Sequence, residues 1–370
     1  MKTKHHKQTL PSMKHFLKPA ALFFCMAALV SCSKDALPIA EEDPIIINPI
    51  SDYTITPDLA DGFTFRFKSL AKDYVKLEWR FGDDTLTTTQ DPTHIYRTPG
   101  EFQVDMMTYS KTGNISHKYV PIKIAADSIL QVITKKTEVP NQLAFSVNIK
   151  SKLKSIEWTF NAVDPATSAV TTIRSTAFNP LQSFAFGSFN NFSVTATTDK
   201  GSTVSLSKNI TTEGIATDIT QSYVSYNSTN ENLVQGPNEG SLKLIDGNTT
   251  TKFGYYKAFE VPETATLGFP APVAVKMYAI ENGNDNDSKR DPKEWYIEGS
   301  NDNSTWDVLD HQLLTIGFAD YLTSIGQAST RYSRFFYYPI AAPKPYKFYR
   351  WRIISTFTPS FQIMEFRLYK

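Results

Sequence analysis

The chain has 370 residues, of which 41% are hydrophobic, 13% aromatic and 20% charged. At about 100–150 residues per domain, this length predicts two to four domains. Lysine and arginine together number 38 and aspartate and glutamate 37, so the charge is nearly balanced. Because a nucleic-acid-binding surface needs a strong basic excess, we expect no nucleic-acid partner. The many aromatic, threonine and valine residues favour strands over helices.

Residues 1–31 have the features of a secretory signal peptide. They contain five lysines, no acidic residue and an apolar run from Pro19 to Val30, which is too short for a membrane span. A start at Met13 instead of Met1 gives a more ordinary signal length, so both starts stay open. Removing the five signal lysines leaves 33 basic against 37 acidic residues, a net charge of −4.

The sequence Leu29-Val30-Ser31-Cys32 ends this segment and resembles a bacterial lipobox. The resemblance implies that Cys32 is lipidated and becomes the first mature residue; the alternative is a plain secreted protein with an incidental cysteine. The acidic run Glu41-Glu42-Asp43 resembles the surface-export tag of Bacteroidetes lipoproteins, which implies a lipid-anchored outer-membrane protein facing the cell exterior. Since Cys25 and Cys32 are the only cysteines, the mature chain has no disulfide and no thiol nucleophile.

A tether is predicted for residues 32–50, followed by a strand-rich segment over residues 51–125. Alternating runs such as 63–67 and 75–81, separated by turn residues, predict a β-sandwich. The pieces Trp79-Arg80-Phe81-Gly82-Asp83, Asp91–Tyr96 and Thr98–Val104 resemble the PKD (polycystic-kidney-disease) repeat. This resemblance implies an immunoglobulin-like sandwich, with Asp84 in place of the usual glycine.

The same pattern recurs over residues 126–213. Ile156-Glu157-Trp158-Thr159-Phe160 repeats the sequence Leu77–Phe81 after 79 residues. The second copy lacks the Gly-Asp turn and the His-x-Tyr piece, so we expect a degenerate PKD or immunoglobulin-like sandwich. Trp79 and Trp158 lie on apolar-alternating strands, which favours a place in the core over a sugar platform.

Residues 218–370 predict one further domain of strands, and no helical period is found outside the signal. Trp295 and Ile297, then Trp306 and Val308, alternate with polar residues on both sides of the turn Gly299–Ser304. This pattern predicts a β-hairpin, and both tryptophans are expected in the core.

The hairpin sequence Arg290–Asp310 resembles the signature hairpin of the discoidin family, the coagulation-factor C-type domains with a galactose-binding-like fold. Further matches to that family lie at Leu242–Phe253, Tyr349–Ile353 and Gln362–Leu368. The resemblance implies a β-sandwich or jelly roll that binds ligands rather than catalyses a reaction. The predicted fold class is therefore all-β: two immunoglobulin-like sandwiches followed by a discoidin-like domain.

Glycan-binding discoidin domains commonly hold a structural calcium ion, and the resemblance implies that the ligands here are Asp246, Asn248, Thr251 and Glu365. A hard cation prefers oxygen ligands, and a glycine-containing loop can wrap carbonyls around it. The alternative is an Asp-Gly turn with an unrelated, exposed Glu365.

A sugar site is expected to combine aromatic rings, which stack on the sugar's C–H face, with planar polar groups that hold its hydroxyls. The acidic, Asn-rich run Glu281–Ser288 fits the loop before the Arg-Asp-Pro piece, where binding residues usually lie. Each candidate has an alternative as a packed or merely exposed loop residue. The candidates are Tyr255, Tyr256, Asn284, Asp285, Arg290, Phe357 and Phe361.

No catalytic residue is predicted. The mature chain has three histidines, His94, His117 and His311, without metal-ligand spacing, and it contains none of the common hydrolase or nucleotide-binding motifs. We expect a non-catalytic cell-surface lipoprotein that captures a glycan or oligosaccharide, similar in architecture to the glycan-binding lipoproteins of Bacteroidetes polysaccharide-utilisation systems. An outer-membrane transport complex is a further candidate partner. The alternatives are an adhesin for proteins or lipids and an unrecognised glycoside hydrolase.

Overall fold

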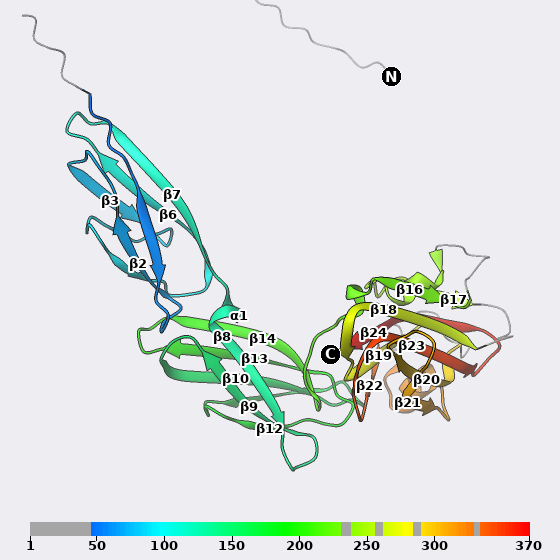
Figure 1. The fold of residues 1–370 in the computed structure, drawn as a ribbon. Helices are drawn as coiled ribbons and strands as arrows, with labels where there is room; N and C mark the ends of the chain where they lie inside the picture. The colour runs from blue at the N-terminus through cyan, green and yellow to red at the C-terminus, as the bar shows by residue number, and fades with distance from the viewer. Residues whose placement is uncertain (1–45, 231–237, 256–261, 284–289, 329–333) are drawn as a thin grey trace, which may run out of the picture. The chain divides into compact units, whose positions relative to one another are not determined.

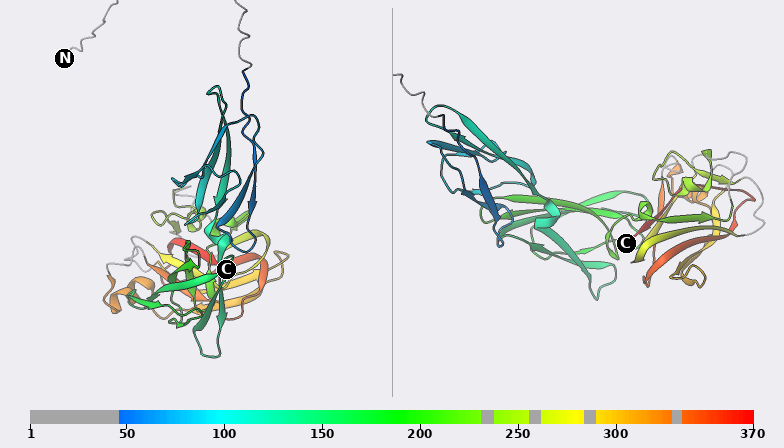
Figure 2. Two further views of the ribbon diagram at one scale, coloured as in Figure 1. Left: turned by 90° about the vertical axis from the view of Figure 1, so that its left-hand side faces the viewer. Right: turned by 45° about the horizontal axis from the view of Figure 1, so that its top comes forward.

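The computed structural model describes residues 46–230, 238–255, 262–283, 290–328 and 334–370. By their contacts, residues 47–370 form one unit, distinct from residues 1–46. Figures 1 and 2 show strands in every part of the described chain and very little helix. The predicted all-β fold class is therefore confirmed. Within the described residues no helix combines the length and the apolar character needed to cross a lipid bilayer.

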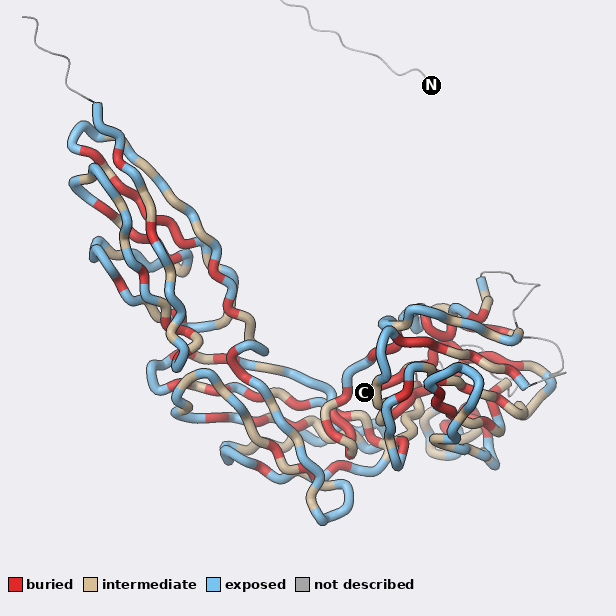
Figure 3. Tube along the Cα trace, viewed as in Figure 1, coloured by how far each residue is buried: buried red, intermediate tan, exposed pale blue. Residues whose placement is uncertain are grey.

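The first sandwich consists of two antiparallel sheets with strand orders β1-β2-β5 and β4-β3-β6-β7. Its strands are β1 (Tyr53–Pro57), β2 (Thr64–Ser69), β3 (Lys76–Arg80), β4 (Leu86–Thr87), β5 (Thr93–Ile95), β6 (Gly100–Tyr109) and β7 (Ile115–Ile124). Alternate residues of the strands face inward, which gives the alternating red and blue segments in Figure 3.

The second sandwich begins with the short helix α1 (Ala126–Ile129) and has sheets ordered β11-β10-β13-β14-β15 and β12-β9-β8. Its strands are β8 (Leu130–Lys136), β9 (Gln142–Ile149), β10 (Leu153–Val163), β11 (Val170–Ser175), β12 (Leu181–Ser183), β13 (Asn190–Thr198), β14 (Thr203–Thr211) and β15 (Gly214–Ala216).

The predicted internal repeat is visible in the two cores. Trp79 and Trp158 are both fully buried on a central strand, and each indole N–H donates to a backbone carbonyl, of Thr89 and Ala177 respectively, at 3.0 Å. A buried tryptophan usually finds such a partner for its N–H. Both residues are therefore core residues, as predicted, and neither offers a ring to a sugar.

The terminal domain has a five-stranded sheet, β16-β18-β23-β20-β21, and a four-stranded sheet, β17-β24-β19-β22. Its strands are β16 (Ser225–Ser228), β17 (Phe253–Tyr255), β18 (Glu263–Ala274), β19 (Met277–Asn282), β20 (Pro292–Ser300), β21 (Asp307–Leu313), β22 (Phe335–Pro339), β23 (Pro345–Thr356) and β24 (Phe361–Tyr369). It also contains helix α2 (Phe318–Ser324) and two 3-10 helices, η1 (Thr220–Ser222) and η3 (Ser241–Leu244).

The prediction that no helix lies outside the signal is wrong for α1 and α2. Helix α2 has only seven residues, of which Phe318, Ala319 and Leu322 are buried. Two turns are too few for a helical period to stand out in the sequence. The buried Asp291 accepts the Ala319 N–H at 3.4 Å, and a Cβ on Gly317 would lie 2.9 Å from the same carboxylate. The Arg-Asp-Pro piece thus fixes the start of α2.

The predicted hairpin forms between β20 and β21, but its two tryptophans differ. Trp295 is fully buried and donates from its indole N–H to the Tyr278 hydroxyl at 2.9 Å. Trp306 is only half-buried, and the Arg350 guanidinium stacks 4.0 Å from its ring centre. The expectation that Trp306 belongs to the core is therefore wrong. It lies before β21 begins, beyond the alternating pattern of the strand.

Candidate functional site

The Asp-Gly loop of the terminal domain folds around the carboxylate of Asp246. Gly247 has φ 75°, a left-handed conformation that favours glycine. The loop then returns, so that the Thr251 hydroxyl donates to Asp246 Oδ2 at 2.8 Å and the Asn248 N–H donates to Oδ1 at 3.0 Å. The sequence Asp-Gly-Asn-x-x-Thr thus closes a compact loop around one charge.

Glu365 reaches this loop from the far end of the sequence. Strand β17, which follows the loop, pairs with β24 in the register Phe253↔Ile363, and this pairing carries Glu365 to the loop. The Asn248 N–H donates to Glu365 Oε1 at 3.0 Å as well as to Asp246. All four residues predicted as calcium ligands therefore meet at one place.

Two cationic side chains share this cluster, which we call the Asp246–Glu365 cluster. Lys243 Nζ lies 3.1 Å from Asp246 Oδ2, and Arg367 Nε lies 3.3 Å from Glu365 Oε2. Burial opposes the charge of Asp246, but the hydrogen bonds from Thr251, the Asn248 N–H and Lys243 outweigh it and lower the pKa of this carboxyl.

Glu365 has the opposite balance. Its side chain is completely buried, and burial raises its pKa to about 8, although Arg367 acts in the other direction; the neighbouring Asp246 carboxyl raises it further. A buried carboxyl beside a second carboxylate holds a proton unless a cation replaces it.

The donor set fits a hard cation in its chemistry. It offers two carboxylates, the Thr251 hydroxyl and loop carbonyls, all of them oxygen ligands. The Asn248 side-chain oxygen is already engaged, because it accepts the Thr250 N–H at 3.0 Å and the Thr250 hydroxyl at 2.7 Å. No group of three or more histidine, cysteine, aspartate or glutamate side chains suited to a metal occurs in the described part of the chain. The loop's neutral oxygens would thus have to complete the coordination.

Glu281 is a further buried acid that the sequence analysis missed. It lies on β19 directly opposite Glu365 on β24 and is 1% exposed. Burial raises its pKa to about 7, opposed by Arg367, and its Oε2 has no hydrogen-bond partner among the described residues. The neighbouring Asn282 is also buried, and within the described ranges neither polar atom of its side chain has a partner. The interpretation of the run Glu281–Ser288 as a loop is therefore wrong for its first two residues, which belong to β19.

The predicted sugar-contacting residues differ in how far they are buried. Tyr255 is half-buried on β17 and pairs in register with Phe361. Arg290 and Phe357 are also half-buried. Phe361 is completely buried and packs against Phe253 and Trp351, so its prediction as a ligand-contacting residue is wrong. It is the first residue of β24 and faces the core. Tyr256, Asn284, Asp285 and Cys32 lie outside the described residues.

The structure brings three of these segments together at the start of β24. The Gln362 N–H donates to the Arg290 carbonyl at 3.0 Å, and the Phe357 N–H donates to the Asp291 carbonyl at 3.2 Å. On its other side the same stretch of β24 pairs with β17, which carries Tyr255. Arg290, Phe357 and Tyr255 therefore come from segments that flank one strand end, which we call the β24 edge.

On the outer face of the five-stranded sheet lies a separate charged group, the Glu298 cluster, which consists of Glu298, Arg350, Arg352, Tyr296 and Trp306. Glu298 is 3% exposed and accepts from Arg350 Nε at 2.7 Å and Arg352 Nη2 at 2.8 Å. The Arg352 guanidinium in turn lies 4.6 Å from the Tyr296 ring centre. Every charge in this cluster has a partner.

Comparison with known proteins gives a match for the first sandwich. The family model described as the PKD domain matches residues 42–124. The predicted PKD resemblance is thereby confirmed. No curated protein shows a significant sequence match to the chain.

Among solved structures, similar chains include a family 32 carbohydrate-binding module from C. perfringens, in complex with galactose. It is 16% identical, with 42% of this chain and 100% of that chain covered and a TM-score of 0.33. The F5/8 type C domain of a Bacteroides fragilis protein is 14% identical, covering 42% and 95%, with a TM-score of 0.34. A chitosan-binding module of a chitosanase/glucanase from Paenibacillus is 12% identical, with 42% of this chain and 99% of that chain covered and a TM-score of 0.31.

Proposed function

We propose that the terminal domain captures a glycan without breaking a bond in it, and that the two sandwiches display this domain at the cell surface. The observation that carries the proposal is the β24 edge, where the segments that contain Arg290, Phe357 and Tyr255 flank one strand end. A guanidinium would supply this edge with a planar donor for hydroxyl groups, and the half-buried aromatic residues would supply a surface for a sugar's C–H face.

The buried acids support binding over hydrolysis. A glycosidase needs two carboxyl groups that touch the substrate, one of them an acid with a raised pKa. Glu281 and Glu365 have raised pKa values, but both are buried at 1% and 0% exposure. Neither reaches a sugar without a rearrangement of β19 and β24.

We further propose that a calcium ion stabilises the Asp246–Glu365 cluster, held by Asp246, Asn248, Thr251 and Glu365. The ion would take over the charge balance that a proton on Glu365 otherwise provides. Its role would be structural: it would cross-link the loop to β24 and so hold β17, with Tyr255, in place.

The surface location is part of the same proposal. A lipid on Cys32 would anchor the chain in the outer membrane, residues 32–50 would form a tether, and residues 51–213 would carry the terminal domain to the cell exterior. An outer-membrane transport complex is the partner that this arrangement would serve.

A glycan array tests the capture proposal. Residues 33–370 are screened with calcium and again with a chelator, and the array includes galactose-terminated, chitosan and pectin glycans as first probes. We expect binding to one glycan class that falls when calcium is removed. Arg290→Ala and Tyr256→Ala should abolish it, whereas Arg174→Ala should not, because Arg174 lies on the second sandwich with its side chain 74% exposed.

A folded protein that binds nothing on a broad array would contradict the proposal and favour the adhesin alternative. Recovery of shortened glycans after incubation with the protein would also contradict the proposal, because it would show hydrolysis.

A further inference from the structure

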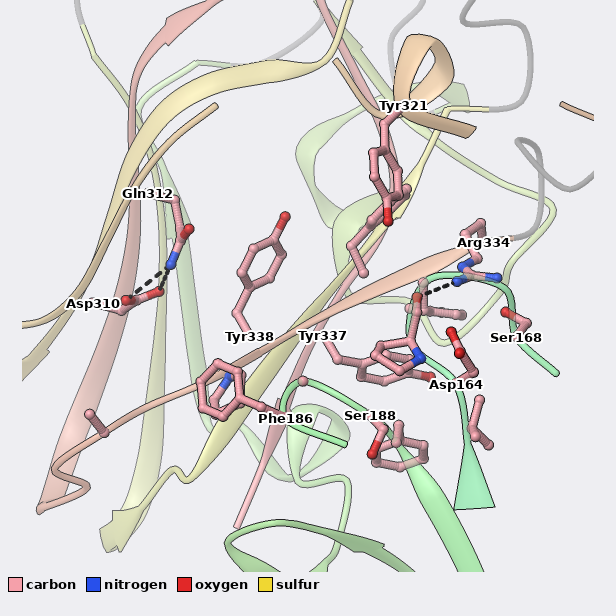
Figure 4. A pocket seen from close by; sticks show the side chains of 18 of the residues that line it. Asp164, Ser168, Phe186, Ser188, Asp310, Gln312, Tyr321, Arg334, Tyr337 and Tyr338 are labelled. Atoms are coloured by element: carbon pink, nitrogen blue, oxygen red, sulfur yellow. Dashed lines mark hydrogen bonds between the residues drawn. The ribbon is translucent and has the colours of Figure 1, made fainter. Parts of the chain in front are cut away.

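A cavity lies where loops of the second sandwich meet the terminal domain (Figure 4). Its volume is about 750 Å³, within the range of about 300–1,000 Å³ that is usual for small-molecule sites. The second sandwich contributes the loops around Asp164 and Phe186, and the terminal domain contributes β21, β22 and α2.

The walls of this cavity are held together by direct contacts. The rings of Phe189 and Tyr337 stack at 4.6 Å with an interplanar angle of 2°, and Phe189 also packs against Tyr369 at 4.9 Å. Arg334 Nη2 donates to the Pro165 carbonyl at 2.7 Å. The cavity is therefore lined by groups that the fold itself positions.

Phe186 presents an exposed aromatic ring at the cavity. Phe186 lines the cavity and is 64% exposed. The next residue, Gly187, has φ +75°, and a Cβ there would lie 3.6 Å from the Tyr337 carbonyl oxygen. The turn at Gly187 brings the loop against β22 and leaves the Phe186 ring at the mouth of the cavity. An exposed phenyl ring beside polar groups is the surface on which sugars stack.

Polar groups converge around that ring. Figure 4 shows Asp310 and Gln312 on one side of the cavity, Arg334 and Asp164 on the other, and the Tyr338 ring between them. Gln312 Nε2 donates to Asp310 Oδ2 at 2.9 Å, and the same oxygen accepts from the Tyr278 hydroxyl at 2.6 Å. The Gln312 carbonyl oxygen and Asp310 can accept from sugar hydroxyls in orientations that these bonds fix.

The charge of the lining decides the ligand class. Among the described residues that line the cavity, Asp164 and Asp310 are acidic and Arg334 is basic, and Arg334 already donates to backbone carbonyls of the loop at Pro165 and Ala166. With two acidic residues and one basic residue that is already engaged, the lining does not attract an anionic ligand such as a phosphate or a uronic acid. It suits a neutral or amino-sugar-containing chain.

We propose that this cavity is a second glycan-binding site, which takes a short neutral or amino-sugar-containing oligosaccharide with Phe186 as the stacking platform and Gln312 and Asp310 as hydrogen-bonding groups. The site uses residues of two domains and none of the β24 edge. It shares only the ligand class with the function proposed above and does not depend on it.

Isothermal titration calorimetry of residues 33–370 tests this site. The probes are galactose, N-acetylgalactosamine-β-1,3-galactose, a chitosan tetramer and, as the anionic comparison, an oligogalacturonate. Phe186→Ala and Gln312→Ala remove the platform and the amide. Phe178→Ala is the matched control, since Phe178 lies on the same sandwich, is 50% exposed and does not line the cavity. Thermal melts verify that each variant folds.

We expect Phe186→Ala and Gln312→Ala to weaken binding of at least one neutral or amino-sugar probe tenfold or to remove one of two sites, while Phe178→Ala leaves it unchanged. Equal affinity and stoichiometry in all three variants, or no binding of any probe, would overturn the second site. Arg290→Ala separates the two proposals. If only Arg290→Ala loses binding, the site at the β24 edge is supported and the cavity site is contradicted. If only the cavity variants lose binding, the cavity site is supported and the site at the β24 edge is contradicted.

Discussion

Two buried glutamates of the terminal domain, Glu298 and Glu365, lie in surroundings that shift their pKa values in opposite directions. In the Glu298 cluster, burial opposes the charge, but hydrogen bonds from Arg352 and Arg350 outweigh it and lower the pKa of Glu298. For Glu365 of the Asp246–Glu365 cluster, burial prevails and raises the pKa to about 8. Burial likewise raises the pKa of Glu281, on the adjacent strand, to about 7.

The carboxylate of Glu298 is fully paired with cations, whereas the acids around Glu365 are not. Two arginines neutralise Glu298, Arg350 through one hydrogen bond and Arg352 through both Nε and Nη2, as is usual for a structural ion pair. Around Glu365, Arg367 contacts one carboxylate oxygen and Lys243 contacts Asp246, which leaves Glu281 without a cation at hydrogen-bond distance in the described structure. Local rules of charge matching are broken most often at functional positions, so the second cluster is the better candidate for an ion.

Removing Glu298 should have the largest effect on stability. Glu298→Ala leaves two arginine side chains without their partner on a half-buried surface, and we expect a loss of about 3 kcal/mol in the free energy of unfolding, without calcium dependence. Urea denaturation measures it. Glu157→Ala is the control, because Glu157 is 57% exposed and pairs with Arg174 at 3.7 Å; an equal loss in both variants would contradict the account.

Calcium should stabilise the other cluster. At a calcium concentration a hundred times the Kd, we expect about 2.7 kcal/mol of added stability, measured by urea denaturation in calcium and in chelator. Asp246→Asn and Glu365→Gln should lose this gain, whereas Glu101→Gln, on the exposed face of the first sandwich, should keep it. A gain that survives in Asp246→Asn would place the ion elsewhere.

The pH dependence should distinguish the clusters further. Because the pKa of Glu281 is raised by burial to about 7, the folded state keeps a proton that the unfolded chain releases near its ordinary value of about 4.3. The contribution to stability is therefore full below the unfolded value and is lost as the pH rises through 7.

In chelator we expect the wild-type protein to lose on the order of 1–2 kcal/mol between pH 5 and 8, and Glu281→Gln to show a flatter profile. Urea midpoints at each pH measure this. Glu298 has the opposite sign, since its lowered pKa gives stability that is lost only as the pH falls through that value. A wild-type profile that rises from pH 5 to 8 would contradict the raised pKa of Glu281.

Trp306 should give the smallest effect. Its half-buried ring stacks on the Arg350 guanidinium, and exposed cation–π contacts contribute about 0.5–1 kcal/mol. Trp306→Ala should therefore cost no more than about 1 kcal/mol in urea denaturation, and Trp306→Phe should recover part of it. A loss as large as that of Glu298→Ala would show that the ring is a core residue after all.

Much of the fold could be predicted from the alternation of apolar and polar residues along the strands. Trp79, Trp158 and Trp295 lie within runs that alternate over several residues, and all three are buried. Trp306 lies outside such a run, next to the turn, so the same reasoning failed there. Helix α2 is too short to show a period, and its start depends on Asp291, which reads in the sequence as part of a turn.

The Asp246–Glu365 cluster was predictable because a family pattern linked the Asp-Gly loop with Glu365, which lies 117 residues after Asn248. Glu281 was not, because an acid at the end of an apolar run is typical of a loop, and only the pairing of β19 with β24 shows that it is buried. Phe357 and Phe361 flank Pro359 alike in the sequence, and the start of β24 decides which one faces the core. The cavity at Phe186 depends on contacts between two domains, which no local pattern encodes.

The central claim is capture of a glycan that stays intact. Titration of residues 33–370 with the glycan found on the array, followed by mass spectrometry of the recovered glycan, tests it most directly. The account predicts saturable, calcium-sensitive binding and a glycan of unchanged mass. Absence of binding by folded protein, or recovery of shorter fragments, would contradict it.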